Sequence, residues 1–266
     1  MNRLSVLGLQ IFVLPCRISS FRFSILGRFQ YFHLLCKYGS KNRSKIYTGY
    51  RVYNTSKLQV LHHEQTVAVV ETGPKRVMYT CELIEVKTDD EKKTTLDDIS
   101  QYIRKKPMKL KFDQMMQLMQ LCDQLPDRKV VGAKYNSATA APPGKEIMQQ
   151  RTFSNFGIFP GTKWCGTGDI ATNYYDLGSE VVVDKCCRAH DICPVKVLGY
   201  AKKYELYNDS FITMSHCECD KQFSQCLKNA KNNIANSMGA VYFNLLGNNC
   251  MFNRNNKYFI GQKPRY

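Results

Sequence analysis

Residues Trp164–Cys193 read WCGTGDIATNYYDLGSEVVVDKCCRAHDIC, and this stretch of the 266-residue chain decides the fold of its C-terminal part. It joins a loop with two spaced glycines to a segment that holds three cysteines and the adjacent pair His190 and Asp191. A glycine loop lets backbone carbonyl oxygens converge, and the second segment adds a carboxylate and an imidazole. Calcium prefers oxygen ligands and an imidazole can act as a general base, so the stretch indicates a hydrolytic calcium site.

The same residues resemble the secreted phospholipase A2 enzymes of group III, the bee-venom type, which carry PGTxWCGxG followed by DxCCRxHDxCP. Here the two halves are Pro160–Gly168 and Asp184–Pro194. The likeness continues through CECDKQF, CLKN and YFNLLGNNC, and it covers about residues 157–250. It implies a mainly α, disulfide-rich phospholipase A2 domain with two antiparallel core helices.

Cysteine usage indicates an oxidising compartment. Eight of the 12 cysteines lie between Cys165 and Cys250, a density typical of secreted or lumenal proteins, in which disulfides persist. At the N-terminus, the apolar run Leu4–Leu14 resembles the hydrophobic part of a signal peptide and is too short to cross a bilayer. The acid-free start also fits a transit-type leader, but the cysteines favour a secreted, extracellular protein.

The net charge of +16 is concentrated upstream of the cysteine-rich part. Residues 152–266 contain 13 Lys and Arg against 9 Asp and Glu, whereas the first 60 residues contain 10 Lys and Arg and no acid. No zinc-finger spacing, groove-reading helix or aromatic RNA-binding signature accompanies this charge, so we expect no nucleic-acid partner. A moderately basic domain suits the anionic surface of a phospholipid membrane.

Periodicity and composition divide the chain into four parts: a poorly defined leader or targeting segment (1–46), a small α+β region (47–126), a linker (127–151) and the phospholipase A2 domain (152–266). In the second part, Thr66–Glu71 and Arg76–Val86 predict two strands joined by a tight turn. Thr95 is expected to cap a short helix, and an apolar stripe over Leu110–Leu125 predicts another helix that packs against the hairpin. Cleavage after Arg151 would make 47–126 a propeptide; the alternative is a two-domain enzyme.

The cysteine spacing predicts two cross-linked helices. Cys186 and Cys193 are seven residues apart, as are Cys219 and Cys226, so each pair lies on one face of a helix. Antiparallel helices would pair Cys186 with Cys226 and Cys193 with Cys219, and parallel helices would give the reverse pairing. The resemblance implies the antiparallel arrangement, together with the bonds Cys165–Cys187 and Cys217–Cys250. The pairing of Cys16, Cys36, Cys81 and Cys122 stays open.

His190 shares a helical face with Cys186 and Cys193, and Asp220 follows Cys219 on the second helix. In the antiparallel arrangement the two side chains can meet, so that the carboxylate holds one imidazole tautomer and leaves the other nitrogen free to take a proton from water. A buried His–Asp pair can also be purely structural. By resemblance, Tyr242 is expected to hydrogen-bond Asp220, although it can also be a core residue.

The resemblance implies one Ca²⁺ ion, held by the carbonyls of Trp164, Gly166 and Gly168 and the carboxylate of Asp191. One formal charge predicts weak binding, in the range of roughly 0.1 to 1 mM. Zinc is the competing metal, since cysteines and His190 are soft ligands, but the disulfide scheme uses those cysteines.

The resemblance further implies hydrolysis of the sn-2 ester of glycerophospholipids at a membrane surface, which releases a fatty acid and a lysophospholipid. His190 would activate water while Ca²⁺ stabilises the oxyanion. We expect a monomer. Candidate membrane contacts are Ile158, Phe159, Lys163, Tyr174 and Tyr175, and the alternative is that these are ordinary core and surface residues. The rival interpretation is a receptor-binding protein on the same scaffold. Three glycosylation motifs begin at Asn42, Asn54 and Asn208.

Overall fold

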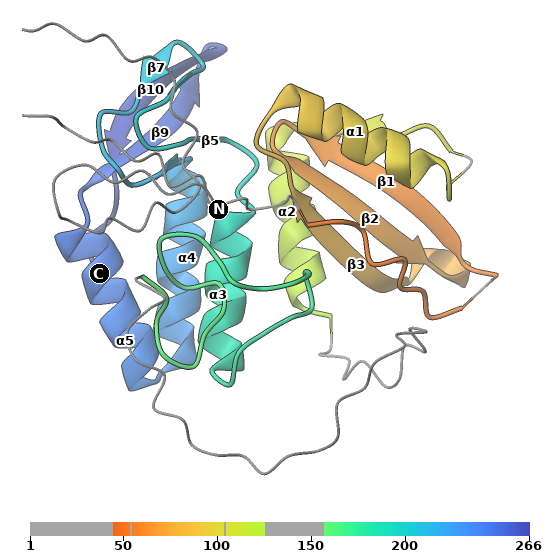
Figure 1. Ribbon diagram of the computed structural model, residues 1–266, viewed down its shortest axis with the longest axis horizontal. Helices are drawn as coiled ribbons and strands as arrows, with labels where there is room; N and C mark the ends of the chain where they lie inside the picture. Colours follow the sequence, from red (N-terminus) through yellow and green to blue (C-terminus); the bar gives the residue numbers. More distant parts are fainter. Residues whose placement is uncertain (1–44, 54, 104, 126–156) are drawn as a thin grey trace, which may run out of the picture. The chain divides into compact units, whose positions relative to one another are not determined.

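The computed structural model describes residues 45–53, 55–103, 105–125 and 157–266 (Figure 1). These residues belong to one compact unit of the chain. Most of the predicted leader, the predicted linker and the glycosylation motifs at Asn42 and Asn54 lie outside the described residues, as do Cys16 and Cys36. The four-part division of the chain stays a prediction.

The N-terminal part of this unit is built on a four-stranded sheet. Strands β1 (Lys57–His63), β2 (Thr66–Thr72) and β3 (Met78–Glu85) are antiparallel, and the short β4 (Met108–Lys109) runs parallel to β1, which gives the order β3-β2-β1-β4. The predicted hairpin corresponds to β2 and β3, which are joined through the 3-10 turn η1 (Pro74–Arg76). Strand β1 is not among the strands expected from the sequence.

Two helices cover the two faces of this sheet (Figure 1). Helix α1 (Asp89–Ser100) packs on one face through Ile99, and α2 (Phe112–Asp123) packs on the other through its methionines. Strand residues point alternately to the two faces: Val67 and Val69 join the α1 cluster, whereas Ala68 and Val70 join the α2 cluster. Both faces of the sheet are therefore buried.

Two details of this part differ from the expectations or extend them. Helix α1 begins earlier than expected, because Thr88 is its N-cap and accepts a hydrogen bond from Glu91 N, so that Thr95 lies inside the helix. A disulfide joins Cys81 in β3 to Cys122 in α2, a pair that the sequence left unassigned. The bond fixes α2 on the sheet.

Two buried glutamates hold residues 45–53 on the sheet. Glu71 accepts hydrogen bonds from Val52 N and Tyr53 N at 2.8 and 2.9 Å. Glu82 accepts from the backbone and the hydroxyl of Thr48 at 2.9 and 2.6 Å. Burial raises the pKa of Glu82 to about 7, against the opposing effect of the Thr48 hydrogen bonds.

Glu82 should make stability fall as the pH rises. Its pKa is higher in the folded than in the unfolded chain, so the folded state keeps the proton more tightly; this contribution is complete below about pH 4.5 and is lost as the pH rises to about 7. Glu82→Gln should remove that slope and stabilise the protein at pH 8 by roughly 3 kcal/mol. Urea unfolding at pH 5 and pH 8 measures the effect, and an unchanged pH slope would contradict it.

The C-terminal part is built on two cross-linked helices that lie side by side (Figure 1). Helix α3 (Val181–Asp191) is joined to α4 (Cys217–Ala230) by Cys186–Cys226 and Cys193–Cys219. The two bonds occur in opposite order along the two helices, so the helices are antiparallel. The bonds Cys165–Cys187 and Cys217–Cys250 are also present, and the four expected pairings are confirmed.

After α4 the chain forms α5 (Asn233–Gly239), which runs directly into a π-helix, η2 (Ala240–Leu245). The expectation of a mainly α domain is too narrow, because the part after α3 also holds paired strands. They are β5 (Lys196–Val197) with β8 (Met214–Ser215), β6 (Lys202–Lys203) with β7 (Leu206–Tyr207), and β9 (Asn249–Arg254) with β10 (Lys257–Gln262).

The hairpins of this part close through two-residue turns without glycine. Asn255 and Asn256 connect β9 to β10 at φ 52° and 60°, and Tyr204 and Glu205 connect β6 to β7 at φ 54° and 63°. Positive φ at both positions is the geometry of tight hairpin turns, where Asn-Gly is the usual sequence signal. The sequence of these turns therefore gave little indication of the hairpins. The fold of this part is mixed helix and strand.

Asn208, the first residue of the third glycosylation motif, is buried. The Asn208 side chain is 5% exposed, and its amide nitrogen donates to the carbonyls of Val197, Leu198 and Ile212 at 3.1, 3.2 and 2.8 Å. A glycan would have to be attached to that same nitrogen. A glycan on Asn208 would therefore have to displace these hydrogen bonds in the folded protein.

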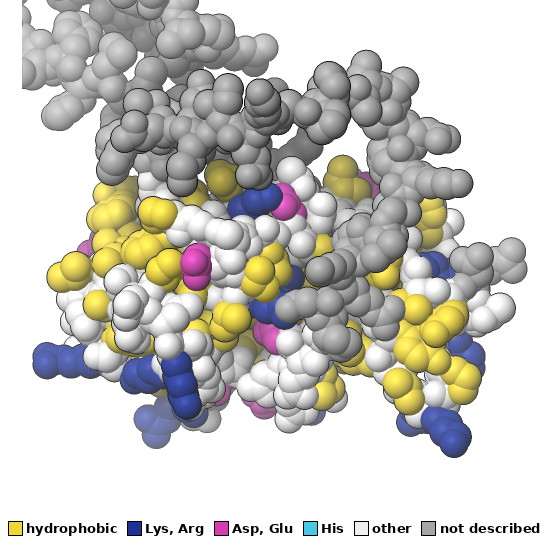
Figure 2. Space-filling view, turned by 90° about the horizontal axis from the view of Figure 1, so that it is seen from below, with side chains coloured by type: hydrophobic (Ala, Val, Ile, Leu, Met, Phe, Trp, Pro, Cys, Tyr) yellow, Lys and Arg dark blue, Asp and Glu magenta, His cyan; other side chains and the backbone are white. Residues whose placement is uncertain are grey.

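Figure 2 shows one face of the molecule, where Lys and Arg side chains gather at separate edges and hydrophobic side chains form several groups. Exposed apolar residues include Tyr200, Phe211 and Leu245, which are 64%, 65% and 75% exposed. Among the described residues, no helix has the length and apolar character needed to cross a membrane.

Candidate active site

His190 and Asp220 meet between the two cross-linked helices, as expected for the antiparallel arrangement. His190 Nε2 lies 2.7 Å from Asp220 Oδ1, and the Asp220 side chain is fully buried. An ionised carboxylate only accepts hydrogen bonds, so a neutral imidazole carries its proton on Nε2 in this pair. Nδ1 of His190 is then the nitrogen with a free lone pair.

Tyr242, from the π-helix η2, completes the contact. Its hydroxyl donates to Asp220 Oδ1 at 2.9 Å and lies 3.2 Å from His190 Nε2. Burial and then the Asp220 carboxylate raise the pKa of Tyr242 well above its usual value, so the hydroxyl keeps its proton and stays a donor. The structure brings all three residues predicted to be catalytic into one cluster.

Aromatic rings fix the orientation of the imidazole. Phe223, one turn beyond Asp220 on α4, stacks on His190 with 4.6 Å between ring centroids, and Tyr242 meets it edge-on at 5.0 Å. The ammonium of Lys263 lies 3.9 Å from the centre of the Tyr242 ring on the far side of this cluster. The imidazole is therefore held by packing as well as by its hydrogen bond.

The glycine loop folds so that its carbonyl oxygens stay available. Phe159 N donates to Cys165 O at 2.8 Å, and Thr167 N donates to Gly157 O at 3.0 Å. Successive carbonyls of an extended chain point in opposite directions, so those of Trp164 and Gly166 point away from this pairing. Among the described residues, we find no hydrogen bond to the carbonyl oxygens of Trp164, Gly166 or Gly168.

Both glycines of the loop are required by its geometry. A Cβ on Gly166 would lie 1.8 Å from the carbonyl oxygen of Gly157, and Gly168 has a φ of +120°. A side chain at either position would displace the loop backbone. The two glycines thus allow the segment around Gly157 to approach the loop closely. The loop offers three backbone carbonyl oxygens as candidate metal ligands.

Asp191 ends α3, next to a buried lysine. The Lys196 ammonium contacts the backbone carbonyl of Asp191 and forms an ion pair with Glu85 at 2.5 Å. Burial raises the pKa of the Asp191 carboxyl well above its usual range, against the opposing effect of Lys196. Because burial disfavours the charged form of Asp191, a nearby cation would stabilise its ionised carboxylate.

The donor set fits calcium by its chemistry. Three carbonyl oxygens and one carboxylate are hard oxygen ligands, which calcium prefers. A zinc site would need several cysteine or histidine ligands, whereas the cysteines of this part are bonded in pairs. In the described part of the chain, no group of three or more His, Cys, Asp or Glu side chains is placed to hold a metal ion.

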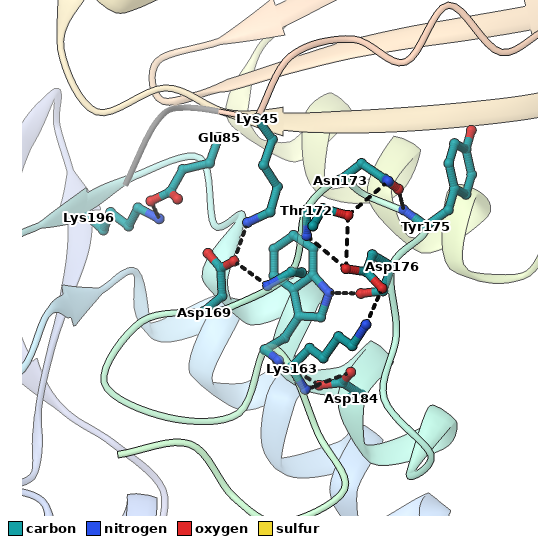
Figure 3. A network of polar contacts seen from close by, with 12 residues as sticks. Lys45, Glu85, Lys163, Asp169, Thr172, Asn173, Tyr175, Asp176, Asp184 and Lys196 are labelled. Carbon is teal, nitrogen blue, oxygen red and sulfur yellow. Dashed lines mark hydrogen bonds and ion pairs between the residues drawn. The ribbon is translucent and has the colours of Figure 1, made fainter. Parts of the chain in front are cut away.

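Asp184 is a residue of this site that was missed from the sequence. Its side chain is fully buried in the first turn of α3, where it accepts hydrogen bonds from Trp164 N and Gly178 N at 2.7 Å and from Lys163 N at 2.9 Å (Figure 3). This carboxylate attaches the glycine loop to the helix that carries His190. It lies three residues before Cys187, whose disulfide reaches the same loop.

A second carboxylate, that of Asp176, links the two ends of the segment from Lys163 to Asp176. Asp176 accepts from the Thr172 backbone and hydroxyl at 2.8 and 2.9 Å and from the Lys163 ammonium (Figure 3). Although burial raises it, these hydrogen bonds hold the pKa of Asp176 below its usual value. The indole of Trp164 donates to the backbone carbonyl of Asp176 at 3.0 Å.

Several residues expected to contact a membrane are otherwise engaged. Tyr174 is buried under the guanidinium of Arg188, which lies 3.9 Å from its ring centre. Phe159 and Tyr175 pack against the core, and Lys163 is paired with Asp176. The docking role expected for Tyr174 is therefore wrong, because neighbouring elements cover it.

Comparison with known proteins agrees with this geometry. The family model for phospholipase A2 matches residues 158–254. The chain is 44% identical over 91 residues to a group 3 secretory phospholipase A2 of Bos taurus, and this covers 34% of the chain but 18% of that protein. It is 43% identical over 93 residues to the acidic phospholipase A2 PA4 of Heloderma suspectum, which covers 35% of the chain and 66% of that protein.

A phospholipase A2 of Bombus terrestris is 42% identical over 94 residues, which cover 35% of this chain and 69% of that protein. The matched part thus spans about two thirds of the insect and lizard proteins and less than a fifth of the bovine one. With the resemblance in the motifs and the disulfide pattern, these matches confirm the family assignment. The chain therefore belongs to the phospholipase A2 family, in its group III secreted type.

Proposed function

We propose that this protein hydrolyses the sn-2 ester of glycerophospholipids at a membrane surface and releases a fatty acid and a lysophospholipid. The observation that carries the proposal is the 2.7 Å contact between His190 Nε2 and Asp220, which leaves the lone pair of His190 Nδ1 free to act as a base. The relatives named phospholipase A2 support this choice of reaction. The α3 and α4 pair is the rigid support of the reacting groups.

In the proposed reaction, Nδ1 of His190 takes a proton from the water that attacks the ester carbonyl. The imidazolium that forms still donates a hydrogen bond from Nε2 to Asp220, and the buried carboxylate stabilises the positive charge. Tyr242 donates to the same carboxylate oxygen and fixes its position. His190 Nδ1 then returns the proton to the glycerol oxygen as the ester bond breaks, so no acyl-enzyme forms.

The carbonyls of Trp164, Gly166 and Gly168 and the carboxylate of Asp191 would hold one calcium ion. When bound, calcium supplies positive charge that stabilises the oxyanion of the reacting ester. The chemistry of the donors and the unpaired carbonyls support this assignment. The single carboxylate supports weak binding, in the range of roughly 0.1 to 1 mM.

The proposed setting is extracellular. The five disulfides and the relatives described as secretory support it. A calcium site of such low affinity would be filled outside the cell, where calcium is abundant, and mostly empty in cytosol. A phospholipid surface is the proposed substrate partner, and the protein is proposed to act as a monomer.

Removing calcium tests the proposal. Fatty-acid release from anionic phospholipid vesicles should fall at least about 100-fold in excess EGTA, because the loss of an oxyanion-stabilising charge costs about that much. Adding calcium back should restore the rate with a midpoint of roughly 0.1 to 1 mM. Vesicles with a labelled sn-1 chain are the control for position. Equal release with and without calcium, or none at all, would refute the proposed function.

A further inference from the structure

Lys196 is a buried lysine just beyond the catalytic helix, and it connects the two parts of the described structure. Its side chain is 4% exposed, and its ammonium pairs at 2.5 Å with Glu85, which belongs to β3 of the N-terminal sheet (Figure 3). The same ammonium donates to the backbone carbonyl of Asp191, the last residue of α3. One cation thus links the N-terminal sheet to the proposed calcium ligand.

The β1–β2 turn holds the backbone on either side of this lysine. Gln65 N donates to Pro194 O at 2.9 Å, and its side-chain oxygen accepts from Lys196 N at 2.9 Å. The Thr66 hydroxyl donates to Ile192 O at 2.6 Å. Gln65 and Thr66 are 2% and 0% exposed. The chain that follows α3 is therefore held by the β1–β2 turn at every second residue, at Ile192, Pro194 and Lys196.

A second contact from the N-terminal part reaches the glycine loop itself. The Lys45 ammonium pairs with Asp169 at 2.5 Å and lies 3.8 Å from the centre of the Trp164 ring (Figure 3). Trp164 and Gly168 both carry proposed calcium ligands, and Asp169 follows directly. Both sides of the proposed calcium site, the loop and Asp191, are thus supported by residues of the N-terminal part.

The two parts also share one hydrophobic core. Met115, Met116 and Met119 of α2 belong to the same buried cluster as the cysteines of α3 and α4, and Met116 Sδ lies 3.8 Å from Cys219 Sγ. Phe112 packs on His216, the N-cap of α4, with 4.1 Å between ring centroids. Separating the parts would expose this apolar surface to water.

We propose that Glu85 and Lys196 are positioning residues for calcium binding, and that residues 45–125 are a retained structural partner of the phospholipase A2 part. This inference rests on the proposed function. It rejects release of the N-terminal part as a propeptide and assigns it to the active protein. Without Glu85, the buried ammonium of Lys196 loses its counter-charge and its fixed position, and the end of α3 loses its support.

The inference is tested by measuring calcium affinity, which does not depend on catalytic turnover. Trp164 is the one tryptophan of the chain and carries a proposed ligand, so its fluorescence can follow a calcium titration of the full-length protein. Glu85→Gln keeps the size of the side chain and removes its charge, and it should weaken calcium binding roughly 10-fold. Glu91→Gln is the matched control in the N-terminal part, since the Glu91 carboxylate accepts from Lys87 N at 2.6 Å at the start of α1; its affinity should stay within about 2-fold.

Lys196→Gln shows whether the two residues act as one unit. The double variant should bind calcium no more weakly than the weaker single variant, because both changes break the same link. If Glu85→Gln binds calcium like the wild type, the inference is wrong, even if the variant unfolds at a lower temperature. If the wild type itself neither binds calcium nor hydrolyses phospholipid, the proposed function fails instead.

Cleavage between the parts gives an independent test. A protease site introduced within residues 127–151 of the full-length chain can be cut after folding. The two products should co-elute in native gel filtration and separate in denaturant, because all five described disulfides lie within one part or the other. The cut protein should keep its calcium affinity. Dissociation of the N-terminal product, with calcium affinity and turnover retained by the remainder, would overturn the inference.

Discussion

Replacing His190 with glutamine should lower kcat for phospholipid hydrolysis by about 10²- to 10⁴-fold, the usual contribution of a general base. Glutamine can still donate to Asp220 from its side-chain amide, but its remaining oxygen is too weak a base to deprotonate water. Circular dichroism should show an unchanged fold, because the disulfides hold α3 against α4 without the imidazole. Initial rates on vesicles at saturating calcium measure the effect.

His62→Gln is the matched control for this variant. His62 lies in β1 of the N-terminal sheet, away from the His190 cluster, so its replacement should leave kcat within about 2-fold, as expected for a site that is independent of the chemistry. Equal turnover by wild type and His190→Gln would remove His190 from the mechanism. The His190–Asp220 contact would then be a structural link between two helices.

Asp184→Ala should destabilise the protein more than any other change at a single carboxylate of the loop. It would leave the buried backbone N–H of Trp164 and the partly buried N–H groups of Lys163 and Gly178 without their acceptor. Each such group costs about 1–3 kcal/mol, and partial relaxation of the loop brings the expected loss in free energy of unfolding to about 3–5 kcal/mol. Chemical denaturation measures this loss, and the calcium titration should weaken in parallel.

Asp209→Ala is the control, because Asp209 is exposed. It should change the free energy of unfolding by less than about 0.5 kcal/mol. If Asp184→Ala unfolds at the same denaturant concentration as the wild type, the Asp184 hydrogen bonds do not hold the loop.

The parts of the site that follow from helical spacing could be predicted from the sequence. Intervals of seven residues between cysteines placed each pair on one face of a helix. The antiparallel order of the helices, which brings His190 to Asp220, came from the family resemblance. The bonds Cys165–Cys187 and Cys217–Cys250 did not follow from spacing and needed the family resemblance. Local geometry thus predicted which cysteines share a helical face, whereas the direction of the helices and the attachment of the loop depended on the resemblance.

Burial by distant segments could not be read from the sequence. Tyr174 looks like an exposed aromatic in a polar loop, yet Arg188 of α3 covers it, and Arg188 is itself paired with Asp123 of α2. Asp184 looks like an ordinary helical acid. Its position three residues before Cys187 was an available signal, because a residue one turn away faces the same loop as the disulfide.

The N-terminal part shows the same limit. The β-branched runs of β2 and β3 and the apolar stripe of α2 were visible in the sequence. Strand β1 was not expected, because it contains the polar residues Lys57, Gln59, His62 and His63. The contacts of Glu85 and Lys45 with the catalytic part join residues more than 100 positions apart. No periodic pattern indicates such pairs.

The π-helix η2 has a consequence for the register of the chain. A π turn accommodates one residue more than an α turn, and here it lets the adjacent Tyr242 and Phe243 both turn inward, one to Asp220 and the other to the ring of Tyr266. Deleting a single residue from 240–245 would tighten the coil and rotate everything that follows by about 100°. Natural variants of this segment should therefore differ by substitution and not by length.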